Sequence, residues 1–352
     1  MKETVTELLR ACVPPLLDWY TQNRRELPWR MEPTPYHVWI SEIMLQQTRI
    51  EAAVPYYERF LHELPDAAAL SVVPEERLLK LWEGLGYYSR ARNLKKAAEQ
   101  VMVCYGGTLP HEASELRKLP GIGAYTAGAI ASIAYGEPEP AVDGNVLRVI
   151  MRLTARGDDV LSPKTRDRVA EELRQVYPSG RSAGLLTEGL MELGETVCIP
   201  NGEARCLLCP LREQCRAFAE GSVDRYPVRS QKKSRRVEER TVLLLRCGER
   251  WAIHRRAENG FLAGMWEFPG LDGRVDKERA EAYLQSLGIK VYEIRECGES
   301  RHIFTHVEWQ MTGYFAECEQ EGGEYVWKSA EEIRNTCAIP TAFKSYIKLV
   351  CK

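Results

Sequence analysis

Four cysteines lie close together in the sequence, at Cys198, Cys206, Cys209 and Cys215. Their spacing, C-x7-C-x2-C-x5-C, allows four thiolates to bind one metal centre. Four-cysteine zinc sites usually contain two C-x2-C pairs, whereas this segment contains one, so the spacing favours a [4Fe–4S] cluster over zinc or no metal. The other seven of the eleven cysteines are scattered. We expect them to be unpaired thiols, because an odd total without a secretion signal argues against a disulfide framework.

A glycine-rich turn stands between two helical patterns, in the string Leu119-Pro120-Gly121-Ile122-Gly123-Ala124-Tyr125-Thr126-Ala127. Gly121 and Gly123 allow the backbone to come close to a partner. The first amides of the following helix are unpaired and lie at the positive end of the helix dipole. These features together favour a phosphate-binding site over a simple turn between helices.

An acid follows this turn, in the string Ala141-Val142-Asp143-Gly144-Asn145-Val146. Aspartate is a favoured N-cap residue, so Asp143 by itself could cap a helix or serve as a catalytic carboxylate. The residue types at this position leave both interpretations open.

A second acid, Glu42, lies in a helical pattern at 36–47 with mostly apolar neighbours. Burial disfavours the charged form of a carboxyl group, so the pKa of Glu42 should be raised and the group should be able to donate a proton. The alternative is an ordinary solvated glutamate on a helix surface. If Glu42 and Asp143 meet in space, they form a pair of carboxyl groups suited to acid-assisted bond cleavage.

The elements that position these residues fall into two halves. Up to about residue 220, apolar residues recur at helical spacing between turn signals. A polar, mostly basic stretch follows, and after it come short β-type runs with one helix. We predict an all-α domain at 1–220, a linker at 221–240 and an α+β domain at 241–352. The expected helices are 36–47, 76–83, 94–103, 124–134, 167–176 and 277–287, and the expected strands are 241–246, 251–255, 304–314 and 325–328.

The composition sets further limits. A chain of 352 residues suggests about two domains. The net charge of −2 is not the bulk signature of a nucleic-acid binder, so any binding to DNA would depend on local clusters and backbone amides. The start, Met1-Lys2-Glu3-Thr4, has no apolar signal core, and no run approaches the length of a membrane span. We expect a cytoplasmic protein that acts as a monomer.

The hairpin, the acid and the cysteines together resemble the helix-hairpin-helix DNA glycosylases with an iron–sulfur loop, the endonuclease III superfamily. Within it, the chain is similar to the MutY family of adenine glycosylases over nearly its whole length. The segments that carry this second resemblance are LPWR at 27–30, SEIMLQQT at 41–48, GLGYYSRARN at 84–93, the hairpin, VDGN at 142–145, the cysteines, GMWEFPG at 264–270 and FTH at 304–306.

The resemblance implies a helical catalytic domain, with the hairpin at 115–134 and the iron–sulfur loop at 198–215, followed by a Nudix-like domain. It implies an enzyme of DNA base-excision repair that hydrolyses the N-glycosidic bond of adenine paired with 8-oxoguanine or guanine, leaving an abasic site. Strand-cutting relatives carry a nucleophilic lysine where this chain has Tyr125, so we expect an essentially monofunctional glycosylase. The Nudix-like helix ends at 285–288 without paired glutamates, which favours a lesion reader over a metal-dependent hydrolase.

The resemblance also implies residue roles. Glu42 would protonate the adenine, and Asp143 would stabilise or covalently trap the sugar cation, with Tyr125 and Asn145 beside them. The expected DNA contacts are Arg30 and Glu188 at the extruded base, Gln47, Thr48, Leu85 and Tyr87 in the duplex, Gly121 and Gly123 at phosphate, and Phe304, Thr305 and His306 at 8-oxoguanine.

Two positions depart from the family pattern. The first cysteine gap has seven residues where six are common, and Thr305 stands where serine is more usual. Two alternatives remain. A pyrimidine-lesion or thymine-mismatch glycosylase could share the string at 45–48, although the C-terminal domain favours the adenine enzymes. A lesion-binding or electron-transfer protein is the non-enzymatic alternative, and the presence of both Glu42 and Asp143 argues against it.

Overall fold

The computed structural model describes residues 4–230, 235–258 and 260–351. It divides into two compact units, the first made of Met1–Val72 and Asn93–Gln231 and the second of Val73–Arg92 and Lys232–Lys352. The second unit therefore combines a short internal segment with the C-terminal third of the chain.

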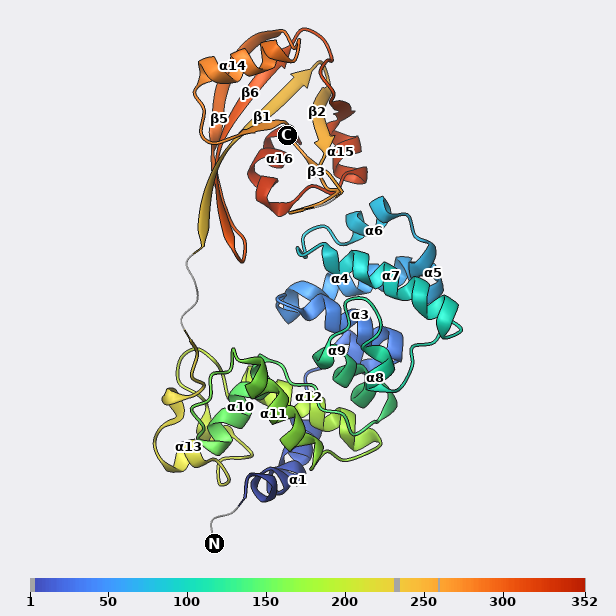
Figure 1. Cartoon of the computed structure of the whole chain (residues 1–352), viewed down its shortest axis with the longest axis vertical. Coiled ribbons are helices and arrows are strands. Elements are labelled where there is room, and N and C mark those ends of the chain that lie inside the picture. Colours follow the sequence, from blue (N-terminus) through green and yellow to red (C-terminus); the bar gives the residue numbers. More distant parts are fainter. Residues whose placement is uncertain (1–3, 231–234, 259, 352) are drawn as a thin grey trace. The chain divides into compact units, whose positions relative to one another are not determined.

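The first unit is helical (Figure 1). Helix α12 packs against α1 and α10, and the apolar faces of α1, α10, α11 and α12 form one core. Its elements are α1 (Val5–Asn23), α2 (Pro28–Met31), α3 (Pro35–Leu45), α4 (Ile50–Glu63), α5 (Ala67–Val72), α7 (Ser89–Cys104, whose first four residues belong to the second unit), α8 (Ala113–Leu116), α9 (Ala124–Ala129), η1 (Ile130–Ala134), α10 (Gly144–Thr154), α11 (Pro163–Arg174), α12 (Arg181–Thr196), η2 (Cys206–Leu208), α13 (Arg216–Ala219) and η3 (Val223–Arg225).

The five helices expected in the first 220 residues are all present, although their ends differ by a few residues. The helix expected at 124–134 changes character, because α9 continues as the π-helical turn η1. At this turn η1 lies very close to α12, since a Cβ on Gly184 would lie 2.9 Å from Cα of Ile133. Single π-turns of this kind often occur at functional sites.

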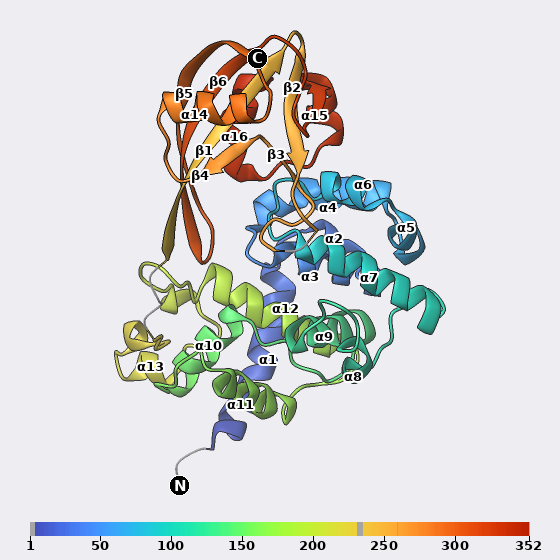
Figure 2. The same ribbon diagram turned by 45° about the horizontal axis from the view of Figure 1, so that its top comes forward.

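The second unit contains a mixed sheet with helices on both faces (Figure 2). The strand order is β3-β2-β1-β6-β5, with β4 paired to β1 and β7 paired to β2; β1 and β6 are parallel and the other pairs antiparallel. Its elements are α6 (Glu75–Leu81), β1 (Arg236–Cys247), β2 (Arg250–Arg255), β3 (Trp266–Glu267), β4 (Gly270–Asp272), α14 (Lys277–Ser286), β5 (Val291–Ile303), β6 (Val307–Cys318), β7 (Val326–Ser329), α15 (Ala330–Thr336), η4 (Thr341–Phe343) and α16 (Lys344–Val350).

The alternation of side chains along β1 explains the two faces, because neighbouring strand residues point to opposite sides. Leu243 and Leu245 belong to the cluster that packs with α14, whereas Val242 and Leu244 belong to the cluster that packs with α15, η4 and α16. The α+β architecture predicted for this half is therefore confirmed.

Several strand boundaries differ from the sequence-based expectation, most importantly the starts of β1 and β6, and the strands β3, β4 and β5 were not expected. Strand β1 begins at Arg236, inside the expected linker, because its polar half pairs with β6 from Arg236 opposite Val307 onward. Side chains there are mostly exposed, so no apolar alternation marks the strand. Strand β6 begins at Val307 and not at 304, because 304–306 form the turn after β5. Of the expected linker, residues 231–234 lie outside the described residues.

The internal segment of the second unit contacts the C-terminal elements through hydrogen bonds. The Lys80 ammonium donates to the Cys337 carbonyl at 3.1 Å, and the Ile339 amide donates to Oε1 of Glu83 at 2.9 Å. The indole of Trp266 donates to Glu76 at 3.2 Å. The first two contacts join α6 and the turn after it to the segment between α15 and α16, and the third joins α6 to β3. In the part of the chain that the structure describes, every helix is too short or too polar to cross a lipid bilayer.

Candidate active site

A cavity of about 850 Å3 opens in the first unit, where α2, α3, α9, α10 and α12 meet. It contains all four residues expected to be catalytic and four of those expected to contact DNA, although they come from positions 30 to 188 of the chain. The predicted residues that line it are Arg30, Glu42, Gln47, Thr48, Tyr125, Asp143, Asn145 and Glu188.

Glu42 is a buried acid on an almost wholly buried helix, with 7% of its surface exposed. Burial raises the pKa of Glu42 to about 7, and the negative charges of Asp143 and Glu188 act in the same direction. A hydrogen bond of 2.5 Å from the Tyr125 hydroxyl to Oε2 of Glu42 opposes this shift. The expected raised pKa is confirmed, so Glu42 is substantially protonated at neutral pH and can donate a proton into the cavity.

Asp143 is the N-cap of α10, and it also lines the cavity. Its Oδ1 accepts from the Val146 amide at 2.7 Å, and its Oδ2 accepts from the Asn145 side chain at 2.9 Å. Burial raises the pKa of Asp143, whereas these two hydrogen bonds lower it. The N-cap interpretation is therefore confirmed, and the capping bonds also fix an acid that lines the cavity and favour its charged form. The catalytic interpretation stays a prediction.

Arg148, a buried arginine on α10 that the sequence analysis missed, connects the Asn145–Asp143 pair to the cysteine loop at 198–215 through hydrogen bonds. Its Nη2 donates to Oδ1 of Asn145 at 2.7 Å, and its Nε donates to the Cys198 carbonyl at 2.7 Å. Nη2 also donates to the Gly194 carbonyl at 2.8 Å. An arginine inside the apolar run 146–151 was the available signal, because a buried guanidinium needs several acceptors.

The inner wall of the cavity is a network of charged side chains. Arg30 and Glu188 form an ion pair at 3.4 Å, and Nη2 of Arg30 contacts Glu192 at 2.8 Å. Glu192 also accepts two bonds from Arg25, at 2.6 and 3.0 Å, and the hydroxyl of Tyr20 donates to Glu188 at 2.9 Å. The sequence analysis named Arg30 and Glu188 but missed the other three. The acids at 188, 192 and 195 were a signal, because this spacing places them on one helix face.

The predicted hairpin is present between α8 and α9. Gly121 has φ +80°, and a Cβ there would lie 2.8 Å from Cβ of Asn93. Gly123 is the N-cap of α9, no side chain caps this helix, and a Cβ there would meet no atom within 4 Å. The two glycines therefore differ, since Gly121 is required by the fold whereas Gly123 leaves the helix start open to a partner.

The remaining predicted DNA contacts lie in the second unit. Thr305 and His306 are exposed in the turn between β5 and β6, while the Phe304 ring packs edge-on against Phe261 and Trp309, with centroids 4.7 and 5.0 Å away. The Tyr87 hydroxyl is hydrogen-bonded to the Thr305 hydroxyl.

Leu85 and Tyr87 differ in how far they could enter a duplex. Leu85 is only 7% exposed and does not project, whereas Tyr87 is 45% exposed and has a left-handed backbone with φ +46°. Of these two residues, the structure presents the tyrosine at the surface.

The four cysteines lie on one loop that follows α12, and three of them pack against the core of the first unit. Burial raises the pKa of Cys209 to about 12, and the charges of the other three thiolates add to this shift. The Arg152 guanidinium donates to Sγ of Cys198 at 3.3 Å. Among the described residues, no group of three or more histidine, cysteine or acidic side chains is arranged to hold a single metal ion. Four thiols on one loop with a cationic neighbour fit a [4Fe–4S] cluster, which takes one thiolate at each of its four irons.

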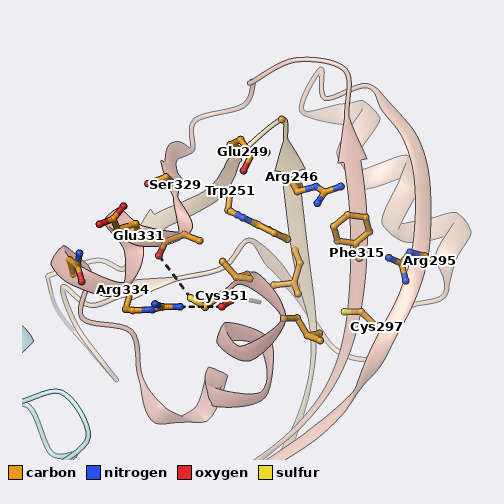
Figure 3. Close-up of a pocket in the computed structure, with 16 residues that line it drawn as sticks. Arg246, Glu249, Trp251, Arg295, Cys297, Phe315, Ser329, Glu331, Arg334 and Cys351 are labelled. Atoms are coloured by element: carbon orange, nitrogen blue, oxygen red, sulfur yellow. Dashed lines mark hydrogen bonds between the residues drawn. The ribbon is translucent and has the colours of Figure 1, made fainter.

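A separate cavity of about 960 Å3 lies in the second unit against β1, β5 and β6 (Figure 3). Phe315 stands in it between two guanidinium groups, those of Arg246 at 5.3 Å and Arg295 at 4.8 Å from the ring centroid. None of the predicted site residues lines this cavity. The residues predicted to be catalytic or to contact the oxidised base therefore lie outside this cavity.

Comparison with known families matches both halves of the chain. Residues 40–179 match the family described as HhH-GPD superfamily base excision DNA repair protein, and residues 241–349 match the NUDIX domain. Among solved structures, a thermostable thymine-DNA glycosylase aligns with a TM-score of 0.55 and 26% identity over 62% of this chain and all of that one. Endonuclease III in a non-covalent DNA complex aligns with a TM-score of 0.52 and 25% identity over 62% of this chain and 99% of that one.

Curated relatives extend over both halves. The adenine DNA glycosylase of Homo sapiens is 32% identical over 402 residues, which cover 95% of this chain and 73% of the human protein. That of Buchnera aphidicola from Acyrthosiphon pisum is 32% identical over 83% of this chain and 82% of its own. The Arabidopsis thaliana adenine DNA glycosylase is 37% identical over 83% of this chain, which spans only 55% of the plant protein.

Proposed function

Because the chain belongs to the adenine DNA glycosylase family, a family of glycosylases that hydrolyse an N-glycosidic bond, we propose that it excises adenine paired with 8-oxoguanine or guanine in duplex DNA. The product is an abasic site. The observation that carries the proposal is the buried Glu42, which lines the same cavity as Asp143 and whose pKa burial raises to about 7.

The chemistry follows from the different environments of the two acids. An extruded adenine is a poor leaving group until a ring nitrogen is protonated, and Glu42 supplies that proton. As the bond to the sugar breaks, positive charge develops on the deoxyribose, and the Asp143 carboxylate stabilises it. Asn145 and the Val146 amide hold that carboxylate, so no reorganisation is needed at the moment of reaction.

The other cavity residues bind and orient the base. Arg30 and Glu188 offer a hydrogen-bond donor and an acceptor at the inner wall, which suits the hydrogen-bonding edge of a purine. Gln47 is exposed at the rim with a left-handed backbone, φ +63°, and there it can replace pairing lost from the duplex. Tyr125 positions Glu42 and takes the place of the lysine that would permit strand cleavage.

The C-terminal turn would recognise the oxidised base opposite the adenine. Thr305 and His306 are exposed, and the Thr305 hydroxyl can donate or accept a hydrogen bond. The packed ring of Phe304 anchors the turn from within the unit. The Nudix-like helix α14 ends at 285–288 without paired glutamates, which supports recognition without hydrolysis at this domain.

We propose that the cysteine loop binds a [4Fe–4S] cluster through Cys198, Cys206, Cys209 and Cys215. When bound, the cluster would supply a rigid anchor for the loop. Arg148 then connects the Cys198 carbonyl to Asn145, so an ordered loop helps to orient Asp143. A purified sample that is brown and absorbs near 400 nm supports this cofactor, and a colourless sample containing zinc contradicts it.

A thymine-specific glycosylase is the competing function, because a thymine-DNA glycosylase matches the fold of the helical half. That likeness covers 62% of this chain, whereas the curated adenine enzymes match both halves. The longer match favours adenine.

The test uses duplexes that carry one adenine opposite 8-oxoguanine, one adenine opposite guanine, or one thymine opposite guanine, followed by alkali. Cleavage at adenine supports the proposal, and cleavage only at thymine overturns it. Replacing Phe304, Thr305 and His306 with alanine should reduce the preference for 8-oxoguanine over guanine in competition binding. Glu42→Gln should retain DNA binding and lose nearly all excision in a single-turnover assay.

A further inference from the structure

A second cavity of about 510 Å3 lies in the helical unit beside the active-site cavity. Its size falls in the range of small-molecule pockets, about 300–1,000 Å3. It shares three lining residues with the active-site cavity, and the rest of its wall comes from α2, η1, the start of α12 and neighbouring turns, with Arg24 at the end of α1. The shared residues are Arg30, Ile133 and Glu188.

Helix α12 shows how the two cavities are arranged. Positions 181, 184, 185 and 188 line the second cavity, and positions 188, 191, 192 and 195 line the active-site cavity. Residues three or four apart lie on the same face of a helix. The two cavities therefore follow one another along one face of α12, with Glu188 at the boundary between them.

The boundary is a contact that can open. Arg30 and Glu188 face each other at 3.4 Å, and both side chains are about one-tenth exposed, at 9% and 13%. Each has a closer partner elsewhere, since Arg30 contacts Glu192 at 2.8 Å and Glu188 accepts from Tyr20 at 2.9 Å. The pair can separate while Arg30 keeps its charged partner Glu192 and Glu188 keeps the hydrogen bond from Tyr20. The positive charge of Arg24, which lines the second cavity, also acts on Glu188.

Resting on the proposed function, we propose that the second cavity is an exit site for the excised adenine, which passes the Arg30–Glu188 pair while the abasic strand remains bound. An extruded base lies deeper in its pocket than the sugar it was attached to. After cleavage, the DNA backbone blocks the mouth of the pocket, and the free base can leave by the mouth only when the DNA withdraws. A passage at the inner wall removes this constraint.

The products balance without any reaction in the second cavity. The bond between the sugar and adenine breaks in the active-site cavity, and adenine keeps the proton from Glu42. Water supplies the hydroxyl of the abasic sugar, and its remaining proton returns to a carboxylate. Neutral adenine then moves past Ile133 toward Tyr135, Arg24 and Arg181, whose phenol ring and guanidinium groups can stack on a purine.

The experiment blocks the second cavity and leaves the active-site cavity intact. Leu185→Trp and Ala134→Leu each add bulk at a residue that lines only the second cavity. Leu161→Trp is the matched control, because Leu161 is 47% exposed and lines neither cavity. A duplex with radiolabelled adenine opposite 8-oxoguanine is reacted under single-turnover conditions. Alkali measures abasic sites, and rapid filtration that retains the protein–DNA complex measures free adenine.

In the wild type and Leu161→Trp, free adenine should appear together with the abasic sites. In both blocked variants, abasic sites should form within about twofold of the wild-type rate, while release of free adenine slows by roughly tenfold or more. Release that keeps pace with abasic sites in both blocked variants overturns the exit route alone. Equal slowing of both steps in both variants also overturns it, because the cavity would then serve substrate binding. A wild type that forms no abasic sites overturns the proposed function and the exit route together.

Discussion

The hydroxyl of Tyr125 donates a hydrogen bond of 2.5 Å to Oε2 of Glu42, the acid whose proton the proposed reaction needs. The bond stabilises the charged form of the carboxyl group, while burial, the larger effect, stabilises the neutral form and raises the pKa to about 7. The tyrosine therefore keeps Glu42 from becoming a permanently protonated acid, so that it can give up its proton near neutral pH.

Tyr125→Phe should move the alkaline limb of the pH–rate profile to higher pH. In the wild type, excision should fall as pH rises through about 7, because Glu42 loses the proton it must donate. Without the tyrosine bond the charged form of Glu42 is less stable, its pKa rises further, and the fall begins later. Single-turnover rates from pH 5 to 9 locate the alkaline limb in both proteins. An alkaline limb at the same pH in both proteins would contradict the assignment of that limb to Glu42.

Glu42→Gln should stabilise the fold at alkaline pH. A folded-state pKa raised to about 7 means that folding favours the protonated acid. The wild type thus keeps its full stability below the unfolded pKa near 4.3 and loses stability as pH rises through about 7. Glutamine has no charge to bury, so the variant should gain up to about 3 kcal/mol at pH 8.5 and nothing at pH 4. Urea unfolding at both pH values measures this difference. Glu99→Gln, at a half-exposed side chain on α7, is the control and should change stability little at either pH.

Alanine substitutions at the two hairpin glycines should have different effects, one on the stability of the fold and the other on DNA binding. Gly121→Ala places a Cβ 2.8 Å from Asn93 on a backbone with φ +80°, so it should reduce stability by about 1–3 kcal/mol. Gly123→Ala meets no atom within 4 Å and should leave the melting temperature nearly unchanged. If the amides at the start of α9 approach a DNA phosphate closely, Gly123→Ala should still weaken binding to a duplex. Unchanged affinity for duplex DNA, measured by fluorescence anisotropy, would remove the phosphate site from the hairpin.

Arg148→Lys should slow excision although Arg148 lines no part of the active-site cavity. A lysine keeps the charge but cannot reach Asn145, Gly194 and the Cys198 carbonyl in the planar geometry of a guanidinium. Loss of one such charge-assisted bond corresponds to about 1.5–3 kcal/mol, or roughly 10–100-fold in rate if it acts wholly on the transition state. Single-turnover rates should fall while DNA affinity stays within about twofold. A normal rate with an unchanged pH profile would show that Asp143 does not depend on this connection.

Some site residues could be predicted from short strings of sequence, because the chemistry of their side chains alone suggests a role. Glu42 and Asp143 lie in compact motifs, and the structure places both at one cavity because α3 and the start of α10 pack beside α9 and α12. Arg148 and Glu192 could not be assigned in this way. Their roles depend on partners 50 and 167 residues away, and only the packed helices bring those groups together.

The predicted strand boundaries were wrong where the side chains of a strand are exposed, because packing does not require apolar residues there. Residues 236–240 pair with β6 through backbone bonds while their side chains remain mostly exposed, so their polar sequence indicated a linker. A similar reason applies to the segment Val73–Arg92, whose place in the second unit was not predicted, since three of its hydrogen bonds to C-terminal elements involve their backbone atoms. Bonds to backbone atoms leave no signal in the side-chain pattern that would reveal either pairing.

The discontinuous second unit has a consequence for how the protein is made. Lys80 and Glu83 leave the ribosome about 250 residues before Cys337 and Ile339, the residues that they bond. At roughly 5–20 residues per second, these two side chains wait on the order of ten seconds or more for their partners. During synthesis, the nascent helical half must therefore remain soluble with α6 incompletely covered. A ribosome stalled before residue 232 would hold an intermediate that trypsin cuts near Lys80 more readily than it cuts the finished chain.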